Sequence, residues 1–196
     1  MFILYALPVG LLLGLLLGGH LGGLGQIRFR WAALAILGFA FQVVLFSEPV
    51  AARVGDAGPA LYVASTAVVL VAVLRNLAIP GMAVVALGAG SNLAAIVANG
   101  GYMPASPSAA AEFGRGVQTT YSNSRIVDAP ALELLTDVIP LPRWLPFANI
   151  VSVGDILIGL GIVIVIVAAM RSARLAAPDP DPGEAATSVR SGNSPI

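Results

Sequence analysis

Long apolar runs without charged residues alternate with short polar connections along most of the chain. No Asp, Glu, Lys or Arg occurs in residues 1–27, 31–47, 57–74, 76–111, 144–154 or 156–170. Apolar runs of about 18 residues or more are typical of helices that cross a lipid bilayer. We therefore predict an all-α integral membrane protein with about five transmembrane helices, over residues 2–19, 31–46, 60–74, 80–100 and 150–170.

The long connection over residues 101–149 contains one further periodic segment, at 130–139. Leu132, Leu135 and Ile139 share one helical face, and polar side chains lie on the other. This pattern predicts a short interfacial amphipathic helix. We expect residues 1–175 to form a single transmembrane domain and the proline-containing tail 176–196 to be disordered.

Composition and charge narrow the classes of function. Only 10% of the 196 residues are charged and the formal net charge is zero, so the chain offers no basic surface for nucleic acid. The absence of cysteine and the single histidine, His20, exclude disulfides, thiolate chemistry and a multi-histidine metal site within one chain. We expect no cofactor and no metal, and the lipid bilayer as the main partner.

The arginines predict the orientation of the chain. With five spans, one side of the membrane would carry Arg28, Arg30, Arg75, Arg171, Arg174 and Arg190. The other side would carry Arg53, Arg115, Arg125 and Arg143, three of them in the long connection. Because cytoplasmic loops are enriched in basic residues, we predict a plasma-membrane protein with its N-terminus and the 101–149 connection outside and its C-terminus in the cytoplasm.

The first predicted span carries a glycine every four residues, at Gly10, Gly14, Gly18 and Gly22. Small residues at this spacing line one helical face and let another helix approach closely. We predict that this face packs against a helix of the same chain, of a second copy or of another membrane protein.

Two amides lie in the fourth predicted span, on the same face as Gly88. Asn99 is expected near the outer surface, and Asn92 about 10 Å deeper. One interpretation is hydrogen bonding between helices, and the other is a polar pocket that opens to the outside. The pair Gly100-Gly101 predicts a helix end after Asn99 that either only terminates the helix or frames a ligand.

Two carboxylates complete the candidate cluster. Asp155 lies three residues after Ser152 at the start of the last span, where an acid favours the helix dipole and a serine can cap the helix. The functional interpretation is an ionisable group held at the membrane edge. Asp137 precedes Asp155 by eighteen residues, and the prolines between them allow the chain to fold back. The two acids would then act on a water molecule as base and acid, whereas the alternative for Asp137 is a solvated surface residue.

Three motifs together resemble a bacterial multi-pass membrane family of unknown function, family 5317. They are Asn99-Gly-Gly-Tyr-Met-Pro, Leu135-Thr-Asp-Val-Ile-Pro and Gly154-Asp155-Ile-Leu-Ile-Gly. The resemblance covers roughly residues 1–175 and implies a location in the bacterial cell membrane. It implies no activity.

A second, weaker likeness is to the lipoprotein signal peptidases, which are membrane aspartic proteases. Asp137 and Asp155 match the order and spacing of the two catalytic aspartates of that family. Ser152 and Gly154 stand where the family has Asn and Ala, the Asn-Gly element lies late in this chain, and five spans replace four.

The sequence therefore predicts a non-enzymatic multi-pass membrane protein whose outward-facing polar cluster binds a ligand, a lipid or a protein partner. The predicted members of the cluster are Asn92, Asn99, Asp137, Ser152 and Asp155. The alternative is a membrane-embedded aspartic hydrolase that uses Asp137 and Asp155.

Overall fold

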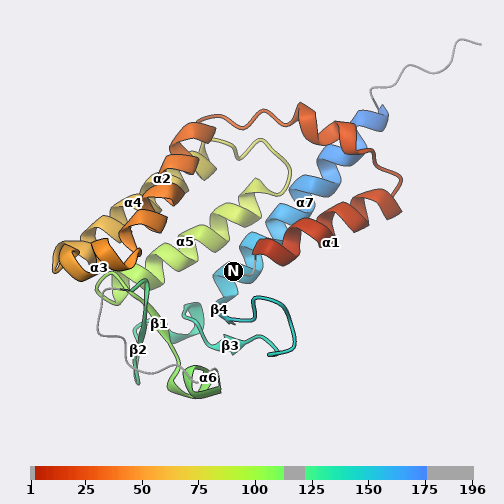
Figure 1. The fold of residues 1–196 in the computed structure, drawn as a ribbon. Helices are drawn as coiled ribbons and strands as arrows, with labels where there is room; N and C mark the ends of the chain where they lie inside the picture. The colour runs from red at the N-terminus through yellow and green to blue at the C-terminus, as the bar shows by residue number, and fades with distance from the viewer. Residues whose placement is uncertain (1–2, 113–121, 176–196) are drawn as a thin grey trace, which may run out of the picture.

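Five apolar helices dominate the structure, a computed structural model that describes residues 3–112 and 122–175. Each falls on one of the apolar runs predicted from the sequence (Figure 1). They are α1 (Ile3–Leu16), α2 (Ala32–Leu45), α4 (Ala57–Leu74), α5 (Met82–Ala98) and α7 (Val153–Leu175). The tail beyond residue 175 lies outside the described residues, as does Arg115.

Not all of these helices have the length of a membrane span. Within the described part of the chain, Ala57–Leu74 and Val153–Ser172 are long and apolar enough to cross a bilayer. A third candidate is α2 taken together with the short α3 (Glu48–Val54), a pair bent by 79°. The helices α1 and α5 are apolar but shorter. The protein is thus a helical membrane protein with two or three candidate spans, and the predicted count of about five is not confirmed.

The helices α1 and α5 are shorter than a membrane span for a local reason. The backbone leaves the helical conformation at Gly18 (φ 76°) after α1 and at Gly100 (φ 70°) after α5. Glycine adopts such left-handed angles without the steric cost that other residues meet. The helix α1 therefore ends before its apolar run does, and α5 is limited to the 17 residues between Gly81 and Asn99.

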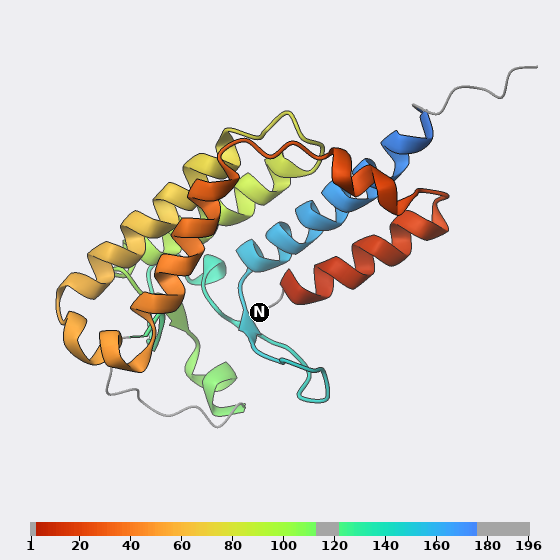
Figure 2. The same cartoon turned by 45° about the horizontal axis from the view of Figure 1, so that its top comes forward.

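The helices lie side by side in the order α2, α4, α5, α7, α1 (Figures 1 and 2). The residues in contact fix their directions: α2 runs antiparallel to α4, α5 runs antiparallel to α7, and α1 runs parallel to α7. The C-terminal ends of α2 and α5 therefore lie at the same end of the bundle as the N-terminal ends of α4 and α7.

The described part of residues 99–152, here called the cap, covers that end of the bundle. It contains β1 (Met103–Ala105), α6 (Pro107–Glu112), β2 (Ser124–Ile126), the 3-10 turn η2 (Glu133–Leu135), β3 (Ile139–Pro140) and β4 (Ile150–Val151). β1 pairs in parallel with β2, and β3 pairs in antiparallel fashion with β4. The cap has a small core of its own, built from Ala105, Ala109, Ala110 and Ile150.

The amphipathic helix predicted over residues 130–139 does not form. In place of a helix the structure has the turn η2 there, preceded by Leu132 in a left-handed conformation (φ 54°) and followed by the start of β3 at Ile139. The backbone N–H of Asp137 donates to the Pro104 carbonyl, and the Asp137 carbonyl accepts from Ser106 N–H. These bonds join the segment to β1. A ten-residue helix is marginal without tertiary support, so the pairing with β1 prevails.

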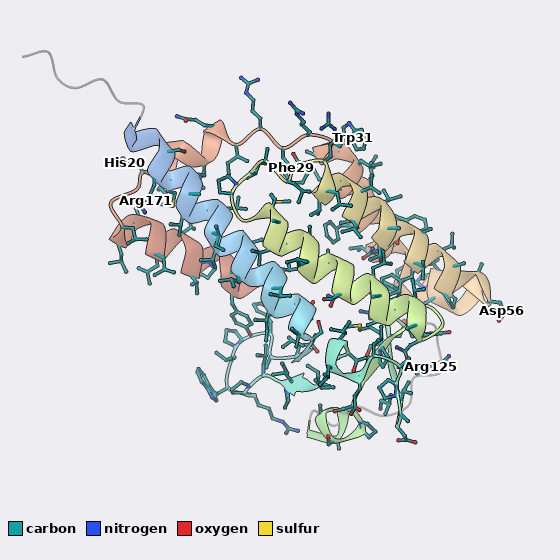
Figure 3. The ribbon with its side chains drawn as sticks, turned by 180° about the vertical axis from the view of Figure 1, so that it is seen from behind. His20, Phe29, Trp31, Asp56, Arg125 and Arg171 are labelled. Carbon is teal, nitrogen blue, oxygen red and sulfur yellow. The ribbon has the colours of Figure 1, made fainter. Side chains whose placement is uncertain are left out.

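The opposite end of the bundle, here called the arginine end, carries the short 3-10 helix η1 (Leu21–Gln26) and the α4–α5 turn. Figure 3 shows Trp31 and Arg171 at this end and Asp56 and Arg125 at the cap end. Among the described side chains, the exposed arginines of this end are Arg28, Arg30, Arg75 and Arg171. The described side chains of this end include no Asp or Glu.

Candidate functional site

A cavity of about 310 Å³ lies between the helices and the cap. Four helices contribute to it, namely α2, α4, α5 and α7, and β1 and β4 contribute from the cap. Its apolar wall consists of Phe39, Tyr62, Val69, Ala89, Ile96, Met103, Ile150, Val151 and Ile158. Its polar residues are Gln42, Thr66, Asn92, Asn123, Asp137, Asn149 and Asp155. Three of the five residues predicted for the polar cluster therefore meet at one cavity.

A close approach of α5 and α7 positions the centre of this site. A Cβ atom on Gly88 would lie 2.5 Å from the Gly154 carbonyl oxygen and 2.8 Å from the Ile158 nitrogen. A Cβ atom on Gly154 would collide with the side chain of Asn92. Only glycine leaves room for this contact, so the two helices bring Asn92 directly against the first turn of α7.

Asn92, Ser152 and Asp155 form one hydrogen-bonded network. Asn92 Nδ2 donates to Asp155 Oδ1 at 2.9 Å, and Ser152 Oγ donates to Asn92 Oδ1, also at 2.9 Å. Asp155 N–H donates to Ser152 Oγ at 3.0 Å, and Ser152 N–H donates to Asp155 Oδ2 at 3.3 Å. The reciprocal pair of bonds is a capping box at the start of α7. Ser152 is fully buried and supports the network from behind the cavity wall.

Asp137 reaches the cavity from the cap. Its backbone is fixed next to Ala105 of β1, and the neighbouring Thr136 is fully buried, with its hydroxyl donating to the Glu133 carbonyl at 2.7 Å. Asp137 therefore comes from a rigid part of the cap, and it lines the same cavity as Asp155.

Two further polar residues belong to the site and were missing from the predicted cluster. Gln42 of α2 donates through Nε2 to Ser65 Oγ at 3.3 Å and to Thr66 Oγ1 at 3.2 Å. The Thr66 hydroxyl in turn donates to the Tyr62 carbonyl at 2.8 Å. A signal for Gln42 was present, since it is the one strongly polar residue of its apolar run. Thr66 carries no comparable signal, because threonine is common in membrane helices.

Asn99 does not line the cavity with Asn92, and a shared polar pocket was one of the two interpretations of this pair. Its amide donates to the carbonyls of Ala95 and Ala131 at 2.8 Å each, and its Oδ1 accepts from Ala131 N–H at 2.9 Å. Gly100 and Gly101 donate to the Val97 and Ile96 carbonyls in a Schellman motif. Asn99 therefore ties the cap to the end of α5 and has a structural role.

The four glycines of the first predicted span separate into two groups. Gly10 lies against Ile166, and Gly14 lies against Met170 of α7. The helix ends before Gly18, and Gly22 lies in η1, where a Cβ atom would meet nothing within 4 Å. The predicted four-residue face is therefore wrong beyond Gly14, and its first half packs within the chain.

The chemistry available at the cavity is that of amides, hydroxyls and two carboxylates. No group of three or more His, Cys, Asp or Glu in the described residues is arranged to hold a metal ion. Asp155 is engaged at both oxygens by Asn92 and Ser152. The arrangement is suited to holding a polar group next to an apolar one.

The sequence comparisons identify the family of this chain. Residues 26–167 match the family of unknown function DUF5317, and the chain belongs to that family. No curated protein and no solved structure matches the chain, so the likeness to lipoprotein signal peptidases gains no support from them.

Proposed function

We propose that this protein binds an amphipathic membrane lipid in the cavity beneath the cap. The observation that carries the proposal is the composition of the cavity wall, in which Phe39, Val69 and Ile158 lie together with Gln42 and Asp155. Pockets for small ligands typically have volumes of roughly 300–1,000 Å³. A cavity of about 310 Å³ is therefore large enough for a head group and the start of a chain, and the rest of the chain would lie in the bilayer.

The exposure of Phe39 supports entry of the ligand from the membrane. This side chain lines the cavity and is 54% exposed, so the cavity reaches the protein surface at α2. Phe39 lies six residues before the end of α2, which corresponds to about 9 Å along the helix from the cap end. Neighbouring residues on α2 are exposed and apolar, namely Ile36, Leu37, Phe41, Val43 and Val44. A lipid chain would find a continuous apolar path there.

The proposed placement in the membrane has all five apolar helices crossing the bilayer, with the cap outside and the arginine end in the cytoplasm. The alternating directions of α2, α4, α5 and α7 support this arrangement, as does the exposed apolar surface of α1. The segregation of Arg28, Arg30, Arg75 and Arg171 to one end supports the orientation. The resemblance to a bacterial family supports the plasma membrane of a bacterium as the location.

A cavity-filling substitution tests the proposal. Ala89 of α5 lines the cavity, whereas Ala94 on the same helix is exposed and does not. We expect Ala89→Phe to reduce the lipid that copurifies with the protein by at least about ten-fold, a cost of roughly 1.4 kcal/mol in binding. Ala94→Phe should leave the amount unchanged. Mass spectrometry of lipid extracted from the protein after detergent exchange measures both. Equal lipid content in the two variants would reject the proposal.

A second candidate function is the aspartic hydrolase. The observation that favours it is that Asp137 and Asp155 line one cavity. In this case Asp137→Asn and Asp155→Asn would each stop the turnover of bound lipid, and mass spectrometry of the lipid after incubation would detect hydrolysis products in the wild type only. Intact lipid in the wild type after many hours would reject the hydrolase, and lipid binding would remain the proposed function.

A further inference from the structure

The loop that joins β3 to β4 exposes two large aromatic side chains. Trp144 is 80% exposed and Phe147 is 72% exposed. Tryptophan is enriched where a bilayer meets water, because its amphipathic ring lies well at the level of the lipid head groups. Two exposed rings in one short loop indicate a surface that contacts an apolar partner.

A hydrogen bond fixes this loop beside the start of α1. The Tyr5 hydroxyl donates to the Pro146 carbonyl, and Figures 1 and 2 show the β3–β4 hairpin next to the N-terminal end of α1. Tyr5 lies two residues after the start of α1, which corresponds to about 3 Å along the helix axis. The loop is therefore level with the first turn of α1, whereas α6 lies farther from the helices in both views.

The surface of α1 is apolar from its first turn onward. Leu4, Leu7 and Val9 are 38%, 47% and 46% exposed, and the helix contains no charged residue. In the placement proposed above, this surface contacts lipid. The exposed rings of the loop then lie where the apolar surface of α1 begins, at the boundary between acyl chains and head groups.

The backbone of the loop suits this boundary because several of its polar groups do not need water. The N–H groups of Leu141, Leu145 and Ala148 donate to carbonyls within the loop. Pro142 and Pro146 have no N–H. Since an unpaired backbone donor is costly away from water, these bonds and prolines lower the cost of placing the loop at the membrane surface.

We infer that the β3–β4 hairpin anchors the cap in the interfacial region of the bilayer through Trp144 and Phe147. The inference rests on the placement of α1 proposed above and does not require a lipid in the cavity. The strand β4 follows the loop directly, and its residues Ile150 and Val151 line the cavity and are each 1% exposed. The anchor therefore holds this wall of the cavity at the depth of the lipid head groups.

Fluorescence quenching by brominated lipids tests this inference. The chain has two tryptophans, so Trp31→Phe leaves Trp144 as the single fluorophore. The full chain is reconstituted into phosphatidylcholine vesicles whose acyl chains carry bromine either near the ester end or near the terminal methyl group. We expect the shallow bromine to quench Trp144 at least about two-fold more strongly than the deep one.

Two further proteins, each with one tryptophan in the Trp31→Phe/Trp144→Phe background, calibrate the depth. Leu12→Trp places the ring at an exposed position of α1, seven residues after Tyr5 and about 10 Å farther along the helix. The deep bromine should quench this ring more strongly than the shallow one. Ala111→Trp places the ring at an exposed position of α6, and neither lipid should quench it.

A spin label provides a second measurement that keeps both native tryptophans. The chain has no cysteine, so Phe147→Cys and Ala111→Cys each carry a single label. We expect the label at Phe147→Cys to collide with a water-soluble nickel complex at least about two-fold less often than the label at Ala111→Cys. Equal collision rates at the two positions would contradict the anchor.

The outcomes separate this inference from the proposals on which it rests. If Trp144 is quenched no more than Ala111→Trp, the inference is overturned, because the loop faces water or a protein partner. Stronger quenching of Trp144 by the deep bromine also overturns it, because the loop then lies among the acyl chains. In both cases, deep quenching of Leu12→Trp would show that the placement of α1 still holds. If neither lipid quenches Leu12→Trp, the placement itself fails, and Ala89→Phe tests lipid binding in the cavity separately.

Discussion

Two asparagines hold the bundle together at its opposite ends, and they do so in different ways. At the arginine end, Asn76 is only 3% exposed and bonds to backbone groups alone. Its Oδ1 accepts from Arg30 N–H at 2.7 Å, and its Nδ2 donates to the carbonyls of Arg30 and Ala72 at 2.8 and 2.7 Å. At the cap end, Asn92 bonds to the side chains of Ser152 and Asp155 and borders a cavity.

This difference distinguishes an asparagine that only stabilises the fold from one that belongs to a candidate site. Asn76 uses its amide to hold the α1–α2 connection against the end of α4, and a fully buried amide of this kind has no contact with a ligand. Asn92 bonds to the side chains of Ser152 and Asp155, and Asp155 lines the cavity together with Asn92. The same residue type therefore stabilises the fold at one end and shapes a cavity at the other.

The largest effect is expected from separating the helices at the cap end. Gly88→Leu places a side chain where the Gly154 backbone lies 2.5 Å from the Cβ position, whereas Gly90 on the same helix faces open space. We expect Gly88→Leu to destabilise the protein by roughly 3 kcal/mol or more, because overpacking must displace backbone. Thermal unfolding in detergent measures this. Gly90→Leu is the control, and similar melting temperatures for the two variants would contradict the close contact of α5 and α7.

The comparison of the two asparagines is tested directly by alanine substitution. Asn76→Ala leaves the part-buried backbone N–H and carbonyl of Arg30 without their Asn76 partner and should cost about 2–3 kcal/mol of stability. Its effect on lipid content should be small. Asn92→Ala should cost less stability, since its partners keep the capping box, but it should reduce lipid content at least about three-fold. Chemical unfolding measures the stability of both variants, and lipid mass spectrometry measures their lipid content. If both variants lost stability and lipid to the same extent, the two asparagines would not have different roles.

A smaller effect is expected from the cap of α7. Ser152→Ala removes the side-chain acceptor for Asp155 N–H and should destabilise the protein by about 1 kcal/mol. Ser172 near the other end of α7 is exposed and donates only to the Ala169 carbonyl. Ser172→Ala should therefore change the unfolding free energy by less than about 0.5 kcal/mol. A Ser152→Ala protein as stable as Ser172→Ala would show that the capping box contributes nothing measurable.

The last prediction concerns the orientation in the membrane, and its substitutions should perturb the structure least. The chain has no cysteine, so Asp56→Cys and Arg171→Cys each introduce a unique thiol at an exposed position of the cap end or the arginine end. Neither should alter stability by more than about 0.5 kcal/mol. In intact cells, a membrane-impermeant maleimide should label Asp56→Cys and not Arg171→Cys. Labelling of Arg171→Cys alone would invert the proposed orientation.

The sequence predicted the five helices because long apolar runs leave few alternatives. It also predicted the meeting of Asn92, Asp137 and Asp155, because their positions implied the same end of the bundle. The cap was not predictable in the same way. Its strands have two or three residues each, too few for an alternating pattern to be recognised. Their pairing depends on contacts between distant segments, as Asp137 with Pro104 illustrates.

The helix α3 and the role of Asn99 were missed for a related reason. A seven-residue helix has almost no periodic signal, and α3 forms because Val50 and Val54 pack against a core that includes Leu45 and Tyr62. Asn99 shared a helical face with Asn92, but Gly100 ends the helix there and turns its amide toward Ala131. Both outcomes depend on tertiary contacts.

The most direct test of lipid binding is a crystal structure of the full chain grown from a lipidic mesophase. We predict elongated electron density in the cavity, with a head group next to Gln42 and Asp155 and a chain that leaves the protein beside Phe39. A cavity that contains only ordered water, or that side chains have closed, would contradict the claim that this protein holds a lipid beneath its cap.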